Sequence, residues 1–217
     1  EADRGARSQA TIAPDTRVMS GDPNVRTEED LERVVRAIAH AFDTDTVIII
    51  GSQAILMSWP DAPRDMRGTP EIDAYPGNAK IWEAAEAARD EDGPPPEASE
   101  HINALFGWGS QFHASHGFYI DGVDEMTAKL PQSWQSRATV RSFNVDGRMV
   151  KTIAPSPDDL IVSKLARLDD KDKGFVEAYH RERKLDVRLI ESRIAETDLD
   201  PVAADKAIAY IRKLGTT

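Results

Sequence analysis

Apolar residues follow two different periods along the chain, and the change from one to the other separates an early part from a late part. Over residues 27–43 the apolar positions recur every three or four residues and share one helical face: Leu31, Val34, Val35, Ile38 and Phe42. Thr27, followed by three acidic residues, is typical of a helix N-terminus. The pattern therefore predicts an amphipathic helix over 27–43.

Strand signals follow this helix and continue to about residue 153. Runs of β-branched or alternating apolar residues predict strands over 46–50, 69–75 and 118–123. Asp146-Gly147, between the runs 137–145 and 148–153, predicts a two-stranded hairpin. The remaining segments of this part are expected to be short helices at 53–57, 79–91 and 98–106, with a loop at 61–68.

The last part of the chain shows only the helical period. It predicts four helices, over 156–168, 171–183, 186–196 and 200–213. Strands mixed with helices, followed by helices alone, are typical of an α+β protein. The sequence therefore predicts a flexible lead-in over 1–25, a core with a mixed β-sheet over 26–154, and a C-terminal helical subdomain over 155–217.

Composition narrows the class of protein. The chain has 217 residues, of which 40% are hydrophobic, and this is enough to bury a core. The absence of Cys excludes disulfides and Cys-ligated zinc and suits a reducing compartment. No run approaches the ~18 apolar residues of a membrane span, and the first residues lack the pattern of a signal peptide. We expect a cytoplasmic protein with no membrane partner.

Charge is unevenly distributed. The net charge is −11, and residues 151–217 hold 13 basic and 13 acidic residues, so the whole excess of acid lies before them. An acidic protein repels nucleic acid at long range, and any nucleic-acid substrate needs a local basic surface. The C-terminal part is the expected place for one.

Two motifs close together in the first part suggest phosphate chemistry. Gly51-Ser52 ends the predicted buried strand, where a glycine, a hydroxyl and free backbone N–H groups suit a phosphate. Glu71 and Asp73 lie two residues apart on the next strand and so point to the same side, where a cation relieves their repulsion. Mg²⁺ suits two carboxylates and a phosphate. The motifs predict a site for a nucleoside triphosphate with its metal.

Further candidate residues include a third acid, two histidines and four tryptophans. Asp121, inside a predicted strand, is the expected third acid, with Asp124 as the second choice. The alternative interpretation is that Gly51-Ser52 is an ordinary turn and that Glu71 and Asp73 lie on a solvated strand face. His113 and His116 lack a third zinc ligand, and the four widely spread tryptophans are interpreted as core or rim residues rather than as a platform for base stacking.

Three stretches resemble a known family: 51-GSQAILMSWPDAPRDMRGTPEIDAYP-76, 131-PQSWQSR-137 and 155-PSPDDLIVSKLARLDDKDKGFVEA-178. They are similar to the DUF-type nucleotidyltransferases related to the AbiEii and MenT-like toxins, over roughly residues 30–195. The resemblance implies a polymerase-β-like nucleotidyltransferase fold, Mg²⁺, a nucleoside triphosphate substrate and a toxin role beside a small DNA-binding antitoxin.

The resemblance also assigns residues by position. Gly51 and Ser52 match the turn that holds phosphates, Glu71 and Asp73 match the metal pair, and Lys164 and Asp172 match the helical Lys and Asp that close the site. The chain departs from the broad superfamily in having Glu71 where that superfamily has Asp. On an unbroken helix, Lys164 and Asp172 would lie 80° apart, near one face.

These observations predict a Mg²⁺-dependent nucleotidyltransferase. The metal ligands are expected to be Glu71, Asp73 and Asp121, with Ser52 and Lys164 on the phosphates and Asp172 orienting Lys164 or the acceptor. The acceptor is expected to be the 3′ end of a tRNA or a protein hydroxyl. A catalytically silent relative that serves as a binding or regulatory module, and a scaffold that needs no metal, are the alternatives.

Overall fold

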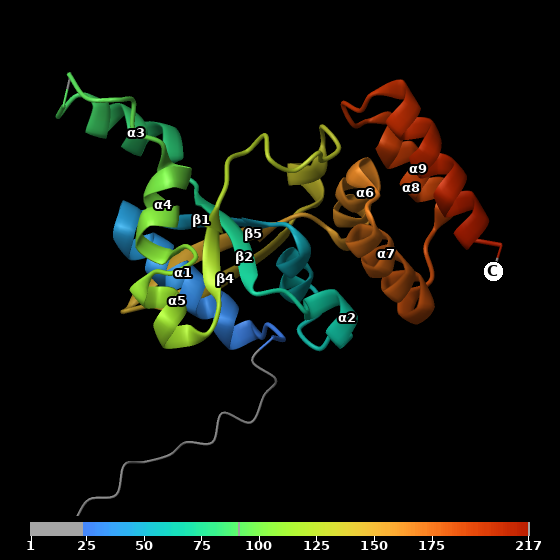
Figure 1. Cartoon of the computed structure of the whole chain (residues 1–217), viewed down its shortest axis with the longest axis horizontal. Coiled ribbons are helices and arrows are strands. Elements are labelled where there is room, and N and C mark those ends of the chain that lie inside the picture. The colour runs from blue at the N-terminus through green and yellow to red at the C-terminus, as the bar shows by residue number, and fades with distance from the viewer. Residues whose placement is uncertain (1–23, 91, 217) are drawn as a thin grey trace, which may run out of the picture.

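A five-stranded mixed sheet forms the centre of the first part of the chain (Figure 1). The computed structural model describes residues 24–90 and 92–216. The sheet has the order β3-β2-β1-β5-β4, and its strands are β1 (Thr46–Ile50), β2 (Glu71–Pro76), β3 (Tyr119–Gly122), β4 (Thr139–Val145) and β5 (Arg148–Ala154). β1 runs parallel to β5 and antiparallel to β2, β2 runs parallel to β3, and β4 and β5 are antiparallel.

Helix α1 (Glu28–Phe42) covers one face of this sheet and contacts β1, β2, β4 and β5. All five residues of its predicted apolar stripe are buried. The helix begins with a capping box: the Asp30 amide donates to Thr27 Oγ1 at 3.3 Å, and the Thr27 amide donates to Asp30 Oδ2 at 3.0 Å. The N-terminus predicted at Thr27 is therefore confirmed.

Strand β2 buries alternate residues on the face that contacts α1 and α4. On β2, Ile72 and Ala74 are fully buried, whereas Glu71, Asp73 and Tyr75 point to the opposite face and are only partly buried. Burial of a side chain such as Ile72 stabilises the fold by about 1.5–3 kcal/mol, which fixes the register of the strand. The same register holds the two acids on the open face.

The edge strand β3 is fixed by helix α4 (Ala98–Phe106), which packs closely on it. A Cβ at Gly122 would lie 2.1 Å from the carbonyl oxygen of Ser99, so only glycine allows this approach. The Gly122 amide also donates to Asn103 Oδ1 at 2.7 Å. These contacts occupy the outer edge of the sheet and hold β3 in place beside β2.

The remaining elements of the first part are short. They are the 3₁₀ helix η1 (Ser52–Met57), the helices α2 (Arg64–Arg67), α3 (Ala79–Ala87) and α5 (Gln111–His116), and the 3₁₀ helix η2 (Trp134–Arg137). The turn between β4 and β5 consists of Asp146 and Gly147, with φ of 51° and 88°, as a tight hairpin requires. The predicted hairpin is confirmed.

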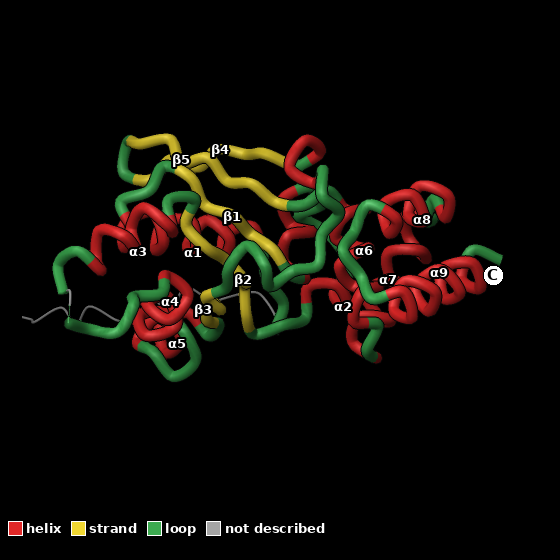
Figure 2. The backbone as a smooth tube through the Cα atoms, turned by 90° about the horizontal axis from the view of Figure 1, so that it is seen from above, coloured by secondary structure: helices red, strands yellow, loops and turns green. Residues whose placement is uncertain are grey.

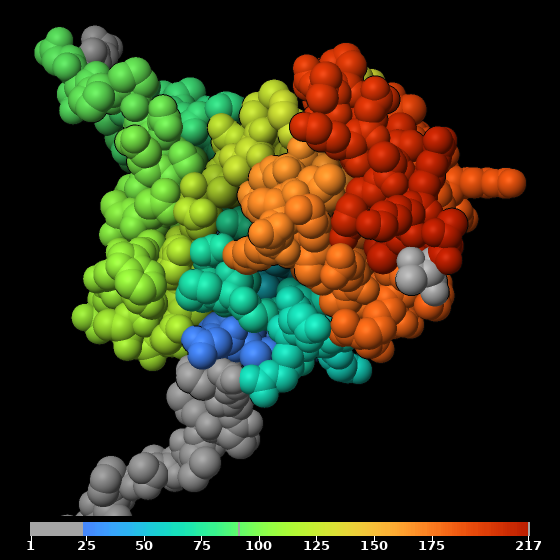
Figure 3. Space-filling view, turned by 45° about the vertical axis from the view of Figure 1, so that its right-hand side comes forward, coloured from blue at the N-terminus to red at the C-terminus, as the bar shows by residue number. Residues whose placement is uncertain are grey.

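Helices form the last part of the chain and lie at one end of the molecule (Figures 2 and 3). They are α6 (Pro157–Arg167), α7 (Asp170–Arg183), α8 (Val187–Ala195) and α9 (Pro201–Leu214). Leu168, with φ of 54°, ends α6, and the Asp169 side chain caps the start of α7. The chain therefore turns a sharp corner between α6 and α7.

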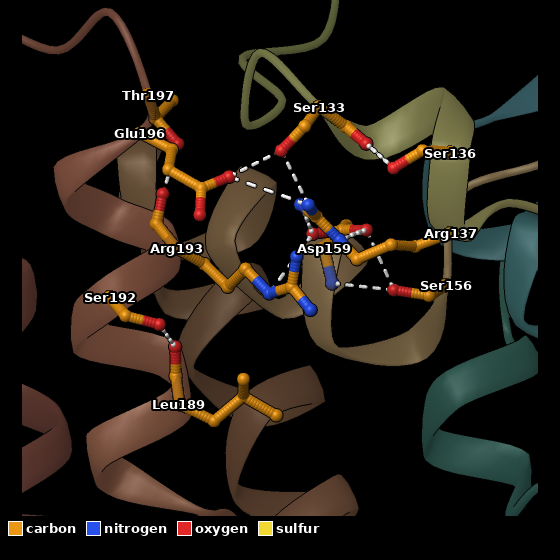
Figure 4. A network of polar contacts seen from close by, with 10 residues as sticks. All are labelled: Ser133, Ser136, Arg137, Ser156, Asp159, Leu189, Ser192, Arg193, Glu196 and Thr197. Atoms are coloured by element: carbon orange, nitrogen blue, oxygen red, sulfur yellow. Dashed lines mark hydrogen bonds and ion pairs between the residues drawn. The ribbon is translucent and has the colours of Figure 1, made fainter.

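A polar network joins the segment before β4 to the helices (Figure 4). Arg137 forms two hydrogen bonds with the fully buried Asp159 of α6, at 3.2 and 2.8 Å. Arg137 also donates to Ser133, whose hydroxyl donates to Glu196 at 2.6 Å. The paired guanidinium and carboxylate hold α6 and the end of α8 against the sheet.

The predicted α+β architecture is confirmed, and it is compatible with a nucleotidyltransferase-like core followed by a helical part. Four details are corrected: the loop predicted at 61–68 contains α2, α5 and the 3₁₀ helix η2 were not predicted, and the helix predicted over 79–91 ends at Ala87. The lead-in predicted for 1–25 lies almost entirely outside the described residues, and the boundary near 154 stays a prediction. Within the described ranges, no helix is long and apolar enough to cross a membrane.

Candidate functional site

Three carboxylates stand on the open face of the sheet. Glu71 and Asp73 are two residues apart on β2, and Asp121 on β3 lies directly beside Asp73 in the strand register. Neighbouring strands are about 4.8 Å apart, so Asp73 and Asp121 are adjacent. The predicted third acid is thus on the same face as the pair. Asp124 is exposed and accepts hydrogen bonds from Met126 and Thr127 in a local turn instead.

The Gly51-Ser52 turn brings β1 up to these acids. Gly51 has φ of 66° and ψ of −166°, a conformation that essentially only glycine adopts. A Cβ at this position would lie 1.5 Å from Asp73 Oδ2. Glycine is therefore needed both for the backbone and for the space that the Asp73 carboxylate occupies. The turn and Asp73, separate in the sequence, are in direct contact.

A buried lysine reaches the turn from the helical part. Lys164 Nζ on α6 donates to Ser52 Oγ at 2.8 Å and pairs with Asp172 Oδ1 on α7 at 3.2 Å. Asp172 is fully buried and also accepts two hydrogen bonds of 3.0 Å from Arg167. Burial lowers the pKa of Lys164, and the charge of Asp172 opposes this effect. Lys164 and Asp172 are thus in contact across the corner between α6 and α7, and the orienting role of Asp172 stays a prediction.

Crowding of negative charge marks the centre of the site. Burial, and then the charges of Asp121 and Glu71, raise the pKa of the Asp73 carboxyl to about 6. Burial and the charge of Glu71 likewise raise the pKa of Asp121. Lys164 offsets this only in part. The folded chain thus keeps two adjacent acids that lack a full counter-charge, which is typical of a functional site.

Glu71 has partners of its own. The Tyr119 hydroxyl donates to Glu71 Oε2 at 2.7 Å, and Lys171 Nζ of α7 lies 3.4 Å from Glu71 Oε1. Burial would raise the pKa of Glu71, but the Tyr119 hydrogen bond and the Lys171 charge together hold it below its usual value. Glu71 is therefore ionised and positioned at one end of the row of acids.

The turn, the three acids, Lys164 and Lys171 line one cleft of about 320 Å³ between the sheet and the helical part. This volume is at the lower end of the range for small-molecule sites. Its charged lining consists of four acids and four basic residues: Glu71, Asp73, Asp121, Asp169, Lys129, Lys164, Arg167 and Lys171. Such a mixture can hold a polyanion and a cation together.

The donor set fits a hard divalent cation. Neither Asp73 nor Asp121 accepts a hydrogen bond from another residue that the structure describes, so their oxygens are available as ligands. Over residues 24–90 and 92–216, no three His, Asp or Glu side chains are gathered closely enough to hold a metal ion by themselves. Mg²⁺ commonly takes one or two carboxylates together with substrate phosphates and water. The metal role of Glu71, Asp73 and Asp121 stays a prediction.

The structure brings all seven predicted site residues to this cleft or its wall. Six of them line it directly, and Asp172 lies behind Lys164. Sequence reasoning missed Arg167, Lys171 and Tyr119. Arg167 follows Lys164 by three residues on the same helix, and Tyr119 precedes Asp121 by two on the same strand. The helical and strand periods therefore place each of them on the same face as a predicted site residue.

A family model matches residues 29–211, which include the acids, the turn, the lysine and both parts of the chain. Its description is "Nucleotidyltransferase of unknown function (DUF6036)". The chain belongs to this family. The match spans most of the chain and supports the nucleotidyltransferase class predicted from the motifs. The relation to the AbiEii and MenT-like toxins stays a prediction. No curated protein and no solved structure matches this DUF6036 chain.

Proposed function

We propose that this protein is a Mg²⁺-dependent nucleotidyltransferase that moves a nucleoside monophosphate from a nucleoside triphosphate to a hydroxyl group. The supporting observation is the shared cleft, in which free carboxylates of the sheet face a hydroxyl and cations from the turn and the helices. Neither charge set alone suits a metal-bound triphosphate. Together they offer ligands for the cation and donors for the phosphates.

Each group has a role in this reaction. Ser52, Lys164 and Arg167 hold the β- and γ-phosphates and stabilise the charge of the departing pyrophosphate. Asp73 and Asp121 would hold Mg²⁺, with Glu71 beside them, and the bound cation would lower the pKa of the acceptor hydroxyl. The acceptor oxygen forms a bond to the α-phosphorus, the bond from that phosphorus to the bridging oxygen of the β-phosphate breaks, and the hydroxyl proton passes to water. Asp172 keeps Lys164 directed at Ser52.

The acceptor in this proposal is an RNA, first the 3′ end of a tRNA, and a protein hydroxyl second. A toxin role in a toxin–antitoxin or phage-defence system, with a small DNA-binding antitoxin as partner, completes the proposal. Its support is the resemblance of three sequence stretches to the toxin-related nucleotidyltransferases.

Label transfer tests the reaction. The protein is incubated with each α-labelled nucleoside triphosphate, Mg²⁺ and either total tRNA or a cell lysate, and the labelled product is identified. Asp73→Ala is expected to abolish transfer, because it removes a carboxylate next to the turn. Asp124→Ala is the matched control, since this acid lies outside the cleft, and it is expected to keep transfer. Transfer that survives Asp73→Ala would contradict the mechanism.

One observation favours a second candidate, a catalytically silent binding module. Glu71 already contacts Tyr119 and Lys171, and Ser52 already contacts Lys164. Some polar groups of the cleft therefore have partners within the protein itself. Such a module binds Mg²⁺-nucleotide without turnover. Ligand at 100 times its Kd would raise the free energy of unfolding by about 2.7 kcal/mol. This gain without any labelled product would support the module.

A further inference from the structure

The segment between α4 and α5 presents an exposed tryptophan near the cleft. The Trp108 side chain is 73% exposed, and its ring packs at 4.5 Å from the ring of His113 and at 5.6 Å from that of Tyr119. Trp59 and Trp82, by contrast, pack against the core. The His113 ring is itself held, because its Nδ1 accepts a hydrogen bond from the Gly109 amide at 3.1 Å. Trp108 is therefore a supported ring with a face open to solvent.

This aromatic cluster, Trp108, His113 and Tyr119, adjoins the row of acids. Tyr119 donates its hydroxyl to Glu71, and Tyr119 and Asp121 point to the same face of β3. Val123, farther along in the same direction, lines the cleft together with residues 127–129. The aromatic cluster consequently lies beyond one end of the acid row, and the 127–129 segment lies at the other.

We propose that Trp108, supported by His113 and Tyr119, is the place where an unpaired base of a single-stranded RNA acceptor stacks. The proposal rests on the proposed function and specifies its acceptor. Stacking on an aromatic ring tolerates any base and is a standard means of holding single strands. A large apolar ring in water is unfavourable by itself, and a stacked base would remove its exposed face from solvent.

The position of the cluster favours the acceptor over the nucleoside triphosphate. In an in-line transfer the attacking and leaving oxygens lie on opposite sides of the phosphorus. The cations expected to hold the leaving pyrophosphate gather at Ser52, which follows β1, whereas Tyr119 is on β3, and β2 with its acids lies between them. The acceptor is therefore expected to approach from the β3 side, where the aromatic cluster lies.

Charge supports RNA as the occupant. Lys171 contacts the same carboxylate as Tyr119, and its side chain is 60% exposed. Lys171 is thus linked to the aromatic cluster through Glu71, and it could pair with the phosphodiester of a base that stacks on Trp108. An aromatic ring next to a lysine matches the alternation of base and phosphate along a strand.

Direct binding tests the proposal without requiring turnover. The probe is a labelled single-stranded oligoribonucleotide of about eight nucleotides with a free 3′ hydroxyl, and its anisotropy is followed on titration with the full chain. Trp108→Ala is expected to weaken binding roughly 5- to 150-fold, the range for loss of one stacked base. Trp108→Phe is expected to retain most of the affinity. Ile81→Ala, at an equally exposed apolar residue of α3, is expected to change nothing.

Two further measurements separate stacking from other causes. The same oligonucleotide with abasic residues is expected to bind the original protein weakly and to lose nothing more in Trp108→Ala. The shift in melting temperature with Mg²⁺-ATP is expected to be unchanged in Trp108→Ala. Loss of the nucleotide shift with intact oligonucleotide binding would overturn the proposal, as would equal binding by Trp108→Ala and Ile81→Ala or no binding by the original protein.

The tests of the stacking site and of the proposed reaction can fail independently. If Trp108→Ala loses oligonucleotide affinity and no labelled product forms under any condition, the stacking site stands and the enzymatic proposal fails. If transfer occurs and Trp108→Ala leaves its KM for RNA unchanged, the reaction stands and the stacking site fails.

Discussion

Asp73 is expected to weaken the fold that holds it. Burial and the neighbouring carboxylates raise its pKa to about 6 from an ordinary value of 3.8. One pKa unit corresponds to about 1.36 kcal/mol, so the ionised carboxylate lowers the free energy of unfolding by about 3 kcal/mol. Asp73→Asn keeps the shape of the side chain and removes its charge. The variant is therefore expected to be more stable than the original protein at pH 8, by up to about 3 kcal/mol.

The sign of the pH dependence follows from the direction of the shift. Between about pH 4 and pH 6 the folded protein keeps a proton on Asp73 that the unfolded chain has lost, so its stability falls as pH rises. The advantage of Asp73→Asn should be complete above about pH 6 and should fade as pH falls toward 4. Urea unfolding in the presence of a chelator, at several pH values, measures both proteins.

A matched acid provides the control. Asp124 is exposed, and hydrogen bonds from Thr127 and Met126 hold its pKa below the usual value, so Asp124→Asn is expected to give no gain. A gain for Asp73→Asn that is equally large at pH 4, or no gain at pH 8, would refute the electrostatic account. If the proposed site binds Mg²⁺-nucleotide, the ligand should stabilise the original protein more than Asp73→Asn, because the cation would supply the counter-charge that Asp73 lacks.

Two further substitutions test the turn and the buried lysine. Gly51→Ala places a methyl group on the Asp73 carboxylate and should lower the free energy of unfolding by more than the ~1–3 kcal/mol of backbone strain alone. The control is Gly117→Ala, where φ is 72° and the space is open, and it should cost about 1 kcal/mol. Equal losses in thermal unfolding would argue against the clash. Asp172→Ala leaves Lys164 buried without its carboxylate and should cost about 3–5 kcal/mol in urea unfolding. Adding Lys164→Met should recover part of that loss, and a double variant no more stable than Asp172→Ala would refute this reasoning.

Local signals in the sequence predicted the parts of the fold that depend on local physics. Thr27 with acids after it marked the start of α1, and Asp146-Gly147 marked the hairpin, because each residue satisfies a specific backbone requirement. The period of two placed Glu71 and Asp73 on one face. The helices α2 and α5, of four and six residues, were missed because they are shorter than the window in which a helical period can be recognised.

The contact between Lys164 and Asp172 depends on tertiary packing, which local sequence signals do not predict. The estimate of 80° assumed one continuous helix, but Leu168 adopts a left-handed conformation and the chain turns there. The two side chains still meet, because α6 and α7 pack against each other across the corner. The partners Lys171 for Glu71 and Lys164 for Ser52 are about a hundred residues apart in sequence, and no local pattern predicts them.

Three of the four acids in the cleft come from the first part of the chain, and three of its four basic residues come from the last part. Glu71, Asp73 and Asp121 precede residue 154, whereas Lys164, Arg167 and Lys171 follow it. A fragment ending at residue 154 would carry a patch of like charge with one lysine near it, and the helices alone would carry only cations and their own carboxylates. A chain truncated after residue 154 would therefore lose most of the cations that offset these acids, and the repulsion between the acids would be strongest at low salt.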